Sequence, residues 1–379
     1  MAGESKDVTS CIVKFDGQQK LSSTTGGEST ETPLGTLESL RVDLRLDAPG
    51  MFSIELDLRS DAVVTVLDAL APGKAVEILL GEVGQETGVL KGEIHYVEPH
   101  FRFDGVSTVS LGGYDHSHRL TRGTRSRTWG DGAQASEHFP SVVRDVIQQS
   151  GSSLSPEVDS VKTKVTYVPQ LNTSDYQMLQ WRAQRGGKDV NADVPNDDRK
   201  VRFKAPDLSA TPIATLVRES PRGEGEEAVT EARFSMSTVR QVDSVVVRGW
   251  DALNKKAIVG TANAPSNGFG GTPGHQLTSR ALGVTGQVLN VVDQPVDSQE
   301  EAEALAQSLF DRLSMDFLTG EVDLPGNPKI VPGVLVQMRG FGTHFDGKYL
   351  VTEAAHELVP KGSGYVTRVK IARNDAPQG

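Results

Sequence analysis

The feature that most constrains this chain is the alternation of apolar and polar residues at positions 37–58. Apolar side chains occupy positions 40, 42, 44 and 46, then 52, 54, 56 and 58, and most of the residues between them are charged. A period of two puts the apolar residues on one face of an extended strand and the charged residues on the other. Because Asp47-Ala48-Pro49-Gly50 at the break supplies turn chemistry, this segment predicts an antiparallel hairpin with one face on a core.

Strand patterns continue through the first 115 residues. After a segment at 61–70 that is compatible with a short helix, apolar stretches typical of strands return at 76–80, 88–97 and 101–112. Short runs of this kind, separated by glycine and proline, are typical of antiparallel β-structure. Residues 1–115 are therefore predicted to form a first small β-barrel.

The next stretch mixes helix and strand signals. Ser174 and Gln177 have the spacing of a capping box at the start of a helix, and Gly186-Gly187 is expected to end that helix. A second helix is predicted at 137–149, and strands are predicted at 201–203 and 232–236. Residues 116–239 are therefore expected to form an α+β insert domain.

Strand patterning returns near position 240 and is interrupted once. Val245, Val247 and Trp250 belong to the returning pattern, and a glycine-rich loop follows them. Ser298 then begins a capping box ahead of apolar residues at helical spacing through position 313. We predict a discontinuous second β-barrel from residues 240–262 and 326–379, with 263–325 as an insert that carries the loop and the helix. The fold class predicted is mainly β with α+β inserts.

The chain contains a short internal repeat. Pro72-Gly73 opens a segment with Val76 and Ile78, and Pro332-Gly333 opens a similar one with Val336 and Met338. Both are followed by a glycine-rich connection and two further strands. Unrelated strand–turn–strand units can also look this similar, so that alternative stays open. A true repeat predicts two related barrels in one chain.

Charge and cysteine content exclude several classes of protein. Fifty acidic residues against 39 basic ones give a net charge of −11, whereas nucleic-acid and membrane-surface binders need a basic surface. Cys11 is the single cysteine, so neither an internal disulfide nor a cysteine metal cluster is available. No apolar run approaches the ~18 residues that span a bilayer, and the first residues lack a signal-peptide core. We expect a soluble protein with several domains.

No motif for catalysis, cofactor binding or metal binding emerges. His116 and His118 could share one face of a strand, but no third ligand has a recognisable spacing and the arginines beside them disfavour a cation. The glycines at 268–274 lack the flanking strand and helix of a phosphate-binding loop. The G-x-S-x-G sequence of many hydrolases is absent from the chain. The sequence therefore predicts no catalytic residue, no cofactor and no metal.

A basic run stands out against the acidic background. It contains Arg119, Arg122, Arg125 and Arg127 and leads to Trp129. Basic residues beside an aromatic side chain are one signature of a nucleic-acid surface. The favoured interpretation is that these arginines form ion pairs with acidic protein surface, either within the chain or as a basic arm between subunits.

Several short motifs resemble those of a known family. They are Ser110-Leu111-Gly112-Gly113-Tyr114-Asp115, Arg125-Ser126-Arg127-Thr128-Trp129, Val247-Arg248-Gly249-Trp250-Asp251, Leu324-Pro325-Gly326-Asn327-Pro328 and Phe345-Asp346-Gly347-Lys348-Tyr349. The first two resemble the end of the first barrel in phage late control gene D proteins and in VgrG-type spike proteins of injection systems. The likeness extends over nearly the whole chain.

This resemblance implies a structural role. Family members form the trimeric baseplate hub of contractile tails, in which two related barrels per chain make a pseudo-sixfold ring. The implied partners are two further copies of the chain, the hexameric inner tube protein, a spike or needle-tip protein and baseplate wedge proteins, with no membrane binding. Assembly is expected in the bacterial cytoplasm. The chain ends at Gly379, directly after the second barrel, so the spike is expected either as a separate chain or as a segment missing from this sequence.

The repeat also places candidate contacts with the tube. The glycine-rich connections at 81–88 and 340–347 occupy the same position in each half, and their candidate residues are Gly84, Gly88, Gly342, His344 and Phe345. Loops carry binding residues while strands fix their placement, although these glycines could serve only tight turns. Two alternatives to the hub stay open: a tail-associated cell-wall or glycan hydrolase, and a nucleic-acid-binding protein acting through 119–127.

Overall fold

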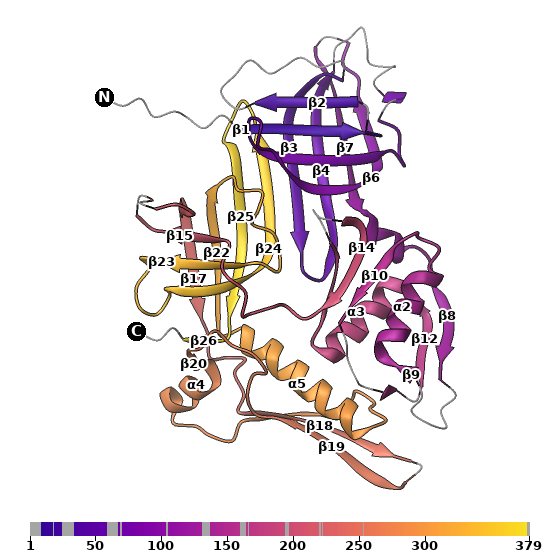
Figure 1. Cartoon of the computed structure of the whole chain (residues 1–379), viewed down its shortest axis with the longest axis vertical. Helices are drawn as coiled ribbons and strands as arrows, with labels where there is room; N and C mark the ends of the chain where they lie inside the picture. The colour runs from indigo at the N-terminus through magenta and orange to yellow at the C-terminus, as the bar shows by residue number, and fades with distance from the viewer. Residues whose placement is uncertain are drawn as a thin grey trace.

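A computed structural model describes residues 9–17, 19–24, 34–58, 67–68, 70–103, 105–130, 137–159, 164–165, 167–193, 197–219, 221, 223–252 and 254–376. The described residues are mainly β, with helices in two inserts, as the fold class predicts (Figure 1). One sheet of 14 strands runs through both halves of the chain.

The first β-unit is built from the first seven strands. The hairpin predicted from the alternation at 37–58 is confirmed: β3 and β4 pair antiparallel, with Leu40 opposite Ile54 and Val42 opposite Phe52. These apolar side chains are buried in one core. The spatial order is β3-β4-β7-β6-β5-β1-β2. The strands are β1 (Thr9–Phe15), β2 (Gln19–Thr24), β3 (Thr36–Arg45), β4 (Ala48–Leu58), β5 (Ala75–Glu82), β6 (Thr87–His100) and β7 (Ser107–Asp115).

The second β-unit repeats this order strand for strand. Its spatial order is β17-β22-β25-β24-β23-β15-β16, so each strand has a counterpart in the first unit. One strand runs in the opposite direction to its counterpart: β15 is parallel to β23, whereas β1 is antiparallel to β5. The strands are β15 (Ala214–Val217), β16 (Glu226–Ala228), β17 (Glu231–Met236), β22 (Leu318–Pro325), β23 (Leu335–Arg339), β24 (Gly347–Val359) and β25 (Gly364–Arg373).

Two expectations differ from this architecture. Small closed barrels were expected, but the ladders formed by the described strands do not close. The strands at 240–262 were expected in the second barrel, yet they belong to a separate sheet, while β15, β16 and β17 come from the segment expected to be an insert. Alternation reports which face of a strand is buried, but not which sheet the strand joins.

The first insert packs two helices with short strands around its own core. The helix predicted from the capping box is confirmed: the Ser174 hydroxyl accepts from the Gln177 amide, and the Gln177 side chain accepts from the Ser174 amide. Gly187 ends it in a left-handed conformation. The elements are η1 (His116–Thr121), β8 (Arg125–Trp129), β9 (Glu137–His138), α2 (Phe139–Gln149), β10 (Ser155–Val158), β11 (Lys164–Val165), β12 (Val168–Thr173), α3 (Asp175–Gly186), β13 (Asp189–Asp193) and β14 (Asp197–Lys204).

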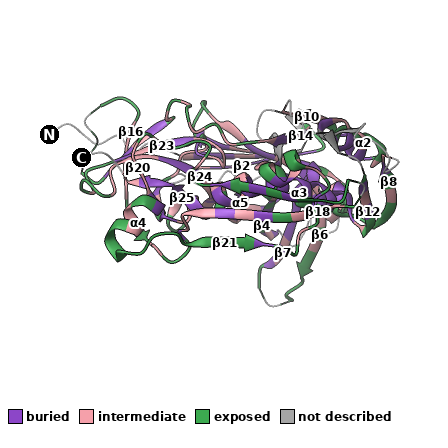
Figure 2. Cartoon of the chain, turned by 90° about the horizontal axis from the view of Figure 1, so that it is seen from below, coloured by how far each residue is buried: buried purple, intermediate pink, exposed green. Residues whose placement is uncertain are grey.

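The second insert lays one long helix on a three-stranded sheet. In α5, Leu305 and Phe310 face this sheet and are buried, so the predicted amphipathic helix is confirmed. The other face of the sheet is open, and Figure 2 shows much of β21 and α4 as exposed. No helix among the described residues has the length and apolar character needed to cross a membrane. The elements are β18 (Ser244–Asp251), β19 (Lys256–Ala262), β20 (Thr272–Pro273), α4 (Gly274–Leu282), β21 (Val288–Val291), α5 (Gln299–Met315) and β26 (Asp375–Ala376).

Candidate assembly interface

The two β-units are joined edge to edge. The outer edge of β3 pairs antiparallel with the second half of β24, from Arg45 opposite Glu353 to Leu40 opposite Leu358. Leu358 and Tyr365 of the second unit are buried in the core cluster of the first. The junction therefore combines a continuous backbone ladder with a shared apolar core.

A histidine lies buried inside this junction. His356 is fully buried opposite Val42. Its Nδ1 lies 2.9 Å from the Tyr365 hydroxyl oxygen and 3.3 Å from the Thr367 hydroxyl oxygen. Burial lowers the pKa of His356 to about 4, because the charged imidazolium would lose its hydration. The neutral ring therefore belongs to the folded state.

Replacing His356 with glutamine is expected to weaken the dependence of stability on acidity. A histidine whose pKa is lower in the folded protein stabilises it fully above the unfolded pKa of about 6.5, and this contribution is lost as the pH falls toward 4. Between pH 7 and pH 4.5 the wild type should therefore lose about 2–3 kcal/mol more free energy of unfolding than the variant. Denaturant titrations at both pH values measure this difference, and equal losses would contradict the assignment.

The outer face of the junction carries charges of both signs. Arg41 lies 3.8 Å from Glu357, and Arg45 lies 3.8 Å from Glu353. Arg368 of β25 bonds to Glu357 at 3.2 Å. Exposed pairs of this kind each contribute less than about 1 kcal/mol. Opposite charges across neighbouring strands nevertheless favour this register over its alternatives.

The internal repeat is confirmed at the level of single hydrogen bonds. Gly73 and Gly333 have φ angles of 89° and 91°. The Gly73 amide donates to the Ile94 carbonyl at 2.8 Å, and the Gly333 amide donates to the Val351 carbonyl at 2.8 Å. A bulge follows each partner, after Ile94 in β6 and after Val351 in β24. Ile94 and Val351 are therefore equivalent positions.

The two predicted tube-facing loops connect equivalent strands. Gly84 lies in the exposed β5–β6 turn with a φ of 83°, next to an exposed Val83, while Gly88 is paired opposite Leu79 in the ladder. Gly84 therefore serves a tight turn, and Gly88 belongs to the strand.

The β23–β24 loop divides its candidate residues between two sides. Gly342 and His344 are exposed. Phe345 instead packs inward, where its ring stacks on Phe234 at 5.0 Å and its carbonyl accepts from the Tyr349 hydroxyl at 2.8 Å. Contact of these loops with a tube stays a prediction, and within this loop the exposed candidates are Gly342 and His344.

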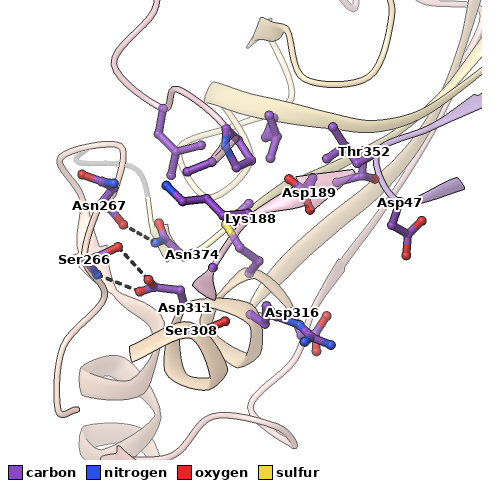
Figure 3. A pocket seen from close by; sticks show the side chains of 18 of the residues that line it. Asp47, Lys188, Asp189, Ser266, Asn267, Ser308, Asp311, Asp316, Thr352 and Asn374 are labelled. Atoms are coloured by element: carbon purple, nitrogen blue, oxygen red, sulfur yellow. Dashed lines mark hydrogen bonds between the residues drawn. The ribbon is translucent and has the colours of Figure 1, made fainter. Parts of the chain in front are cut away.

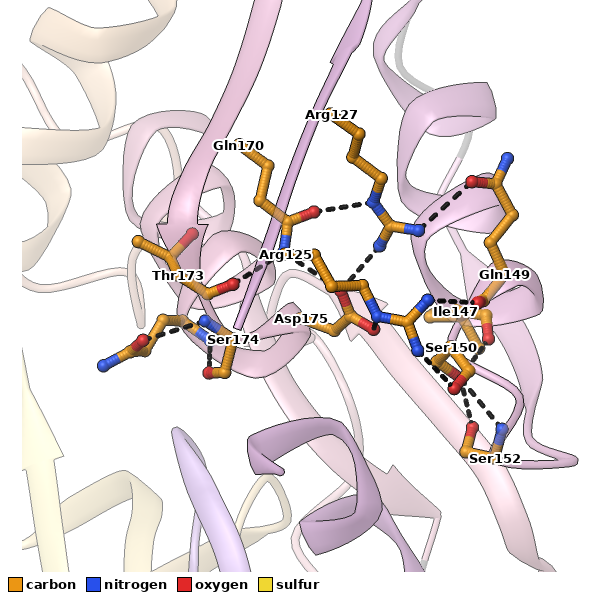
Figure 4. A network of polar contacts seen from close by, with 11 residues as sticks. Arg125, Arg127, Ile147, Gln149, Ser150, Ser152, Gln170, Thr173, Ser174 and Asp175 are labelled. Atoms are coloured by element: carbon orange, nitrogen blue, oxygen red, sulfur yellow. Dashed lines mark hydrogen bonds and ion pairs between the residues drawn. The ribbon is translucent and has the colours of Figure 1, made fainter. Parts of the chain in front are cut away.

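Most arginines of the run form contacts within the chain, and Figure 4 shows those of Arg125 and Arg127. Arg125 and Arg127 both bind the Asp175 carboxylate at the start of α3, at 3.4 and 2.5 Å. Arg119 binds the Glu93 carboxylate and donates to the Ser152 carbonyl. Intrachain ion pairing is therefore confirmed for these three arginines. Arg122 lies exposed, and a role of the run between subunits stays a prediction.

The paired histidines lie beside the first β-unit. His118 lies against His95, with ring centroids 3.9 Å apart, and stacks on Tyr114 at 5.2 Å. Desolvation is the largest cause that lowers the pKa of His118 to about 4. His116 Nε2 lies 3.7 Å from a Glu93 carboxylate oxygen. No group of three or more His, Cys, Asp or Glu side chains in the described part of the chain is placed to hold a metal ion.

A pocket of about 470 Å³ lies where several parts of the chain meet (Figure 3). Asp47 of the first unit, Lys188 and Asp189 of the first insert, and Asp311 of α5 all line it. Burial, with a smaller effect of Asp47, raises the pKa of Asp189 to about 7. The Asp311 carboxylate accepts from the amide and hydroxyl of Ser266. This pocket therefore lies between the β-units and the inserts.

Solved structures with this fold come from tails and secretion systems. A 43 kDa tail protein of prophage MuSo2 from Shewanella oneidensis is 13% identical, with a TM-score of 0.66 over 98% of this chain and 100% of that one. A tail protein from Neisseria meningitidis MC58 is 13% identical, with a TM-score of 0.63 over 97% and 96%. The E. coli c3393 protein, a type VI secretion component described as similar to T4 tail proteins gp27 and gp5, is 9% identical, with a TM-score of 0.56 over 97% and 79%.

Sequence comparison adds one family match. The model described as "Alg8 N-terminal domain" matches residues 59–359. None of the curated proteins matches the chain. At identities this low, the solved structures establish the fold: this chain has the fold of phage tail proteins and of a type VI secretion component.

Proposed function

We propose that this chain, which belongs to the Alg8 N-terminal domain family, is a structural baseplate hub of a contractile phage tail or injection system. In this role three copies form a ring that joins a hexameric inner tube to a trimeric spike. Its partners are the tube protein, a spike or needle-tip protein and baseplate wedge proteins. The proposed role is non-enzymatic, and assembly takes place in the bacterial cytoplasm.

The observation that carries the proposal is the repeated strand order within one chain. Two units lie side by side in one sheet, and their strands have the same order when each unit is numbered from its own first strand. That order is β3-β4-β7-β6-β5-β1-β2 in the first unit and β17-β22-β25-β24-β23-β15-β16 in the second. Three such chains present six similar units, which matches the symmetry of a hexameric tube, while the inserts differ and keep the symmetry threefold. The tail and secretion proteins that share this fold support the same assignment.

The loops at equivalent positions are the proposed contacts with the tube. The β5–β6 turn with Gly84 and the β23–β24 loop with Gly342 and His344 recur at the same place in each unit. A ring of three chains would therefore display six such loops at one end. Equivalent positions allow six identical tube subunits to be contacted in similar ways.

The purified chain is expected to form a closed particle of three copies of 40.7 kDa each. Cyclic assemblies satisfy every copy of an interface, so larger open polymers are not expected. Light scattering at micromolar concentration measures the mass, and averaged electron micrographs should show six similar lobes around a centre. A stable monomer at micromolar concentration would contradict the hub.

A further inference from the structure

Besides the terminal strands β2 and β16, each of which pairs on one side only, each β-unit has one further strand edge that pairs with no described strand. In β6, residues up to Glu93 pair with β5, but the edge beyond Ile94 is open on that side. In the second unit, β17 pairs with β22 alone. Figure 1 shows β17 on the left of the molecule and β6 on the right. Beyond the terminal strands β2 and β16, the chain therefore carries an open edge on β6 and another on β17, on opposite sides.

The repeat shows what covers the equivalent of the first open edge inside the chain. Since Ile94 corresponds to Val351, the open segment 96–100 of β6 together with the next residue, Phe101, corresponds to 353–358 of β24. That segment of β24 is covered by β3. The repeat thus assigns a β3-like strand to the open edge of β6.

The counterpart of β3 in the second unit is β17, and the ladders fix their alignment. Val42 of β3 lies opposite Phe52, which lies opposite Gly113. Phe234 of β17 lies opposite Gly320, which lies opposite Ile371. Gly113 and Ile371 are the partners of the equivalent residues Ile94 and Val351. Val42 therefore corresponds to Phe234. The open edge of β17 is equivalent to the edge of β3, and the open edge of β6 is equivalent to the edge of β24, so together they could form a junction like β3·β24.

We propose that β6 of one copy pairs antiparallel with β17 of the next copy and so repeats the β24·β3 junction between chains. Transfer of the internal register sets Val97 opposite Met236, Pro99 opposite Phe234 and Phe101 opposite Ala232 of the neighbour. The number of copies in the ring rests on the proposed hub function. The residues that pair are derived from the internal repeat alone. Two different edges meet, so the contact is head-to-tail and closes into a ring when the rotation fits.

The side chains of both edges suit this pairing. On the inward face, the equivalents Leu358 and Leu40 are fully buried inside the chain, whereas Phe101 is 52% exposed. Met236, at the end of β17, is 42% exposed. Burial of these apolar side chains against each other would remove them from water. The inward residues are Val97 and Pro99 on β6, Phe101 directly after it, and Ala232, Phe234 and Met236 on β17.

The outward face is polar, as it is in the internal junction. Glu98 and His100 alternate with the inward residues of the open β6 segment, and Arg233 and Ser235 do so in β17. Arg233 stands at the position of Arg41, which pairs with Glu357 across the internal junction. Apolar and polar faces thus coincide when the two edges are joined in this register, and a shift by one residue would oppose them.

Pro99 modifies the ladder at one point. Pro99 occupies the position that His356 has in β24, opposite Val42. In the internal junction the Leu46 amide donates to the carbonyl of Thr352, the residue opposite it, so Leu46 and Thr352 form a hydrogen-bonded pair. Since hydrogen-bonded and non-hydrogen-bonded pairs alternate, Val42 and His356 are also a hydrogen-bonded pair. Pro99 has no N–H, so its pair keeps one hydrogen bond instead of two. A proline on an open edge also hinders indiscriminate strand addition, which leaves the specific side-chain contacts to select the partner.

Cysteine cross-linking tests the pairing and its register. Glu98 and Ser235 occupy the positions of Ala355 and Asp43, a non-hydrogen-bonded pair with its Cα atoms about 4.5 Å apart, and this distance allows a disulfide. The double variant Glu98→Cys/Ser235→Cys should give covalent dimers and trimers under mild oxidation. The native Cys11 does not interfere, because it is fully buried and burial raises its pKa to about 12.

A shifted pair is the matched control. Glu98→Cys/Arg233→Cys places the thiols on diagonal positions about 7–8 Å apart, beyond easy disulfide reach, and should give at least fivefold less covalent product. A particle of three chains that gives no covalent oligomer with the Glu98/Ser235 pair overturns the pairing and leaves the hub intact. Equal cross-linking of the two pairs overturns the register. A monomer that gives no covalent oligomer overturns both the pairing and the proposed function.

Discussion

Replacing Phe310 with aspartate is expected to unfold the second insert. Phe310 is 2% exposed and lies in the core between α5 and the β18–β19 sheet, together with Leu305 and Val247. Loss of a buried phenylalanine costs about 3–5 kcal/mol, and an unpaired carboxylate in an apolar core adds to that cost. The free energy of unfolding should fall by more than about 4 kcal/mol. Whole domains are stable by only about 5–15 kcal/mol, so this loss removes much of the stability.

An exposed position on the same helix provides the control. Glu303 is exposed on α5, so Glu303→Asp places the same residue at a solvent-exposed position of the helix and should change stability by less than about 0.5 kcal/mol. Thermal unfolding followed by circular dichroism compares both variants with the wild type. A Phe310→Asp variant that melts with the wild type would mean that this helix face is not buried in solution.

Local elements could be predicted from the sequence because their signals lie within a few residues. The alternation at 37–58 sets the β3·β4 hairpin, and the capping boxes at Ser174 and Ser298 mark where α3 and α5 begin. The repeat at Gly73 and Gly333 was also visible, since a positive φ in a tight turn favours glycine. Each of these signals depends on backbone geometry that is independent of distant parts of the chain.

The assembly of the second unit could not be predicted in the same way. The chain leaves β17 at Met236 and returns to its partner β22 at Leu318, so residues 237–317 separate two paired strands. The strands of the second insert show the same alternation as their neighbours, and nothing local assigns them to another sheet. This explains why the edge strand β17, the counterpart of β3, was placed in an insert.

Side-chain direction limited what could be predicted for the candidate sites. Phe345 follows His344 in an exposed loop, yet its ring turns into the Phe234 cluster. The acidic partner of Arg125 and Arg127 is Asp175, which is far away in sequence. Such contacts depend on tertiary packing, which a single sequence without an alignment does not reveal.

The glycine pair in the family-like motif has a structural reason. A Cβ atom on Gly113 would lie 1.8 Å from the Glu93 carbonyl oxygen, and one on Gly112 would lie 2.6 Å from the Tyr96 ring. Both contacts are far below van der Waals distance, so β6 and β7 approach closely only because these residues lack side chains. The Gly112-Gly113 pair therefore lets β7 lie close against β6, the strand whose edge beyond Ile94 is open.

Replacing Asp375 with alanine is expected to lower the free energy of unfolding by about 3–5 kcal/mol, because it leaves a buried guanidinium unpaired. Arg373 and Asp375 are each 3% exposed, and the Arg373 Nε donates to the Asp375 carboxylate at 2.6 Å. The same carboxylate accepts from the amides of Phe269 and Gly271 at 3.0 and 2.6 Å. This one side chain therefore fixes the end of the second unit to the loop that precedes α4.

The matched control removes an aspartate from an exposed ion pair. Asp323 lies 3.1 Å from Arg368 on the open face of the second unit, so Asp323→Ala should cost less than about 1 kcal/mol. Denaturant unfolding compares the two variants, and hydrogen exchange should show faster exchange at the Phe269 and Gly271 amides in Asp375→Ala alone. Equal losses in both variants would mean that Arg373 finds solvent or another partner, and that the loop is fixed to the second unit by its other contacts.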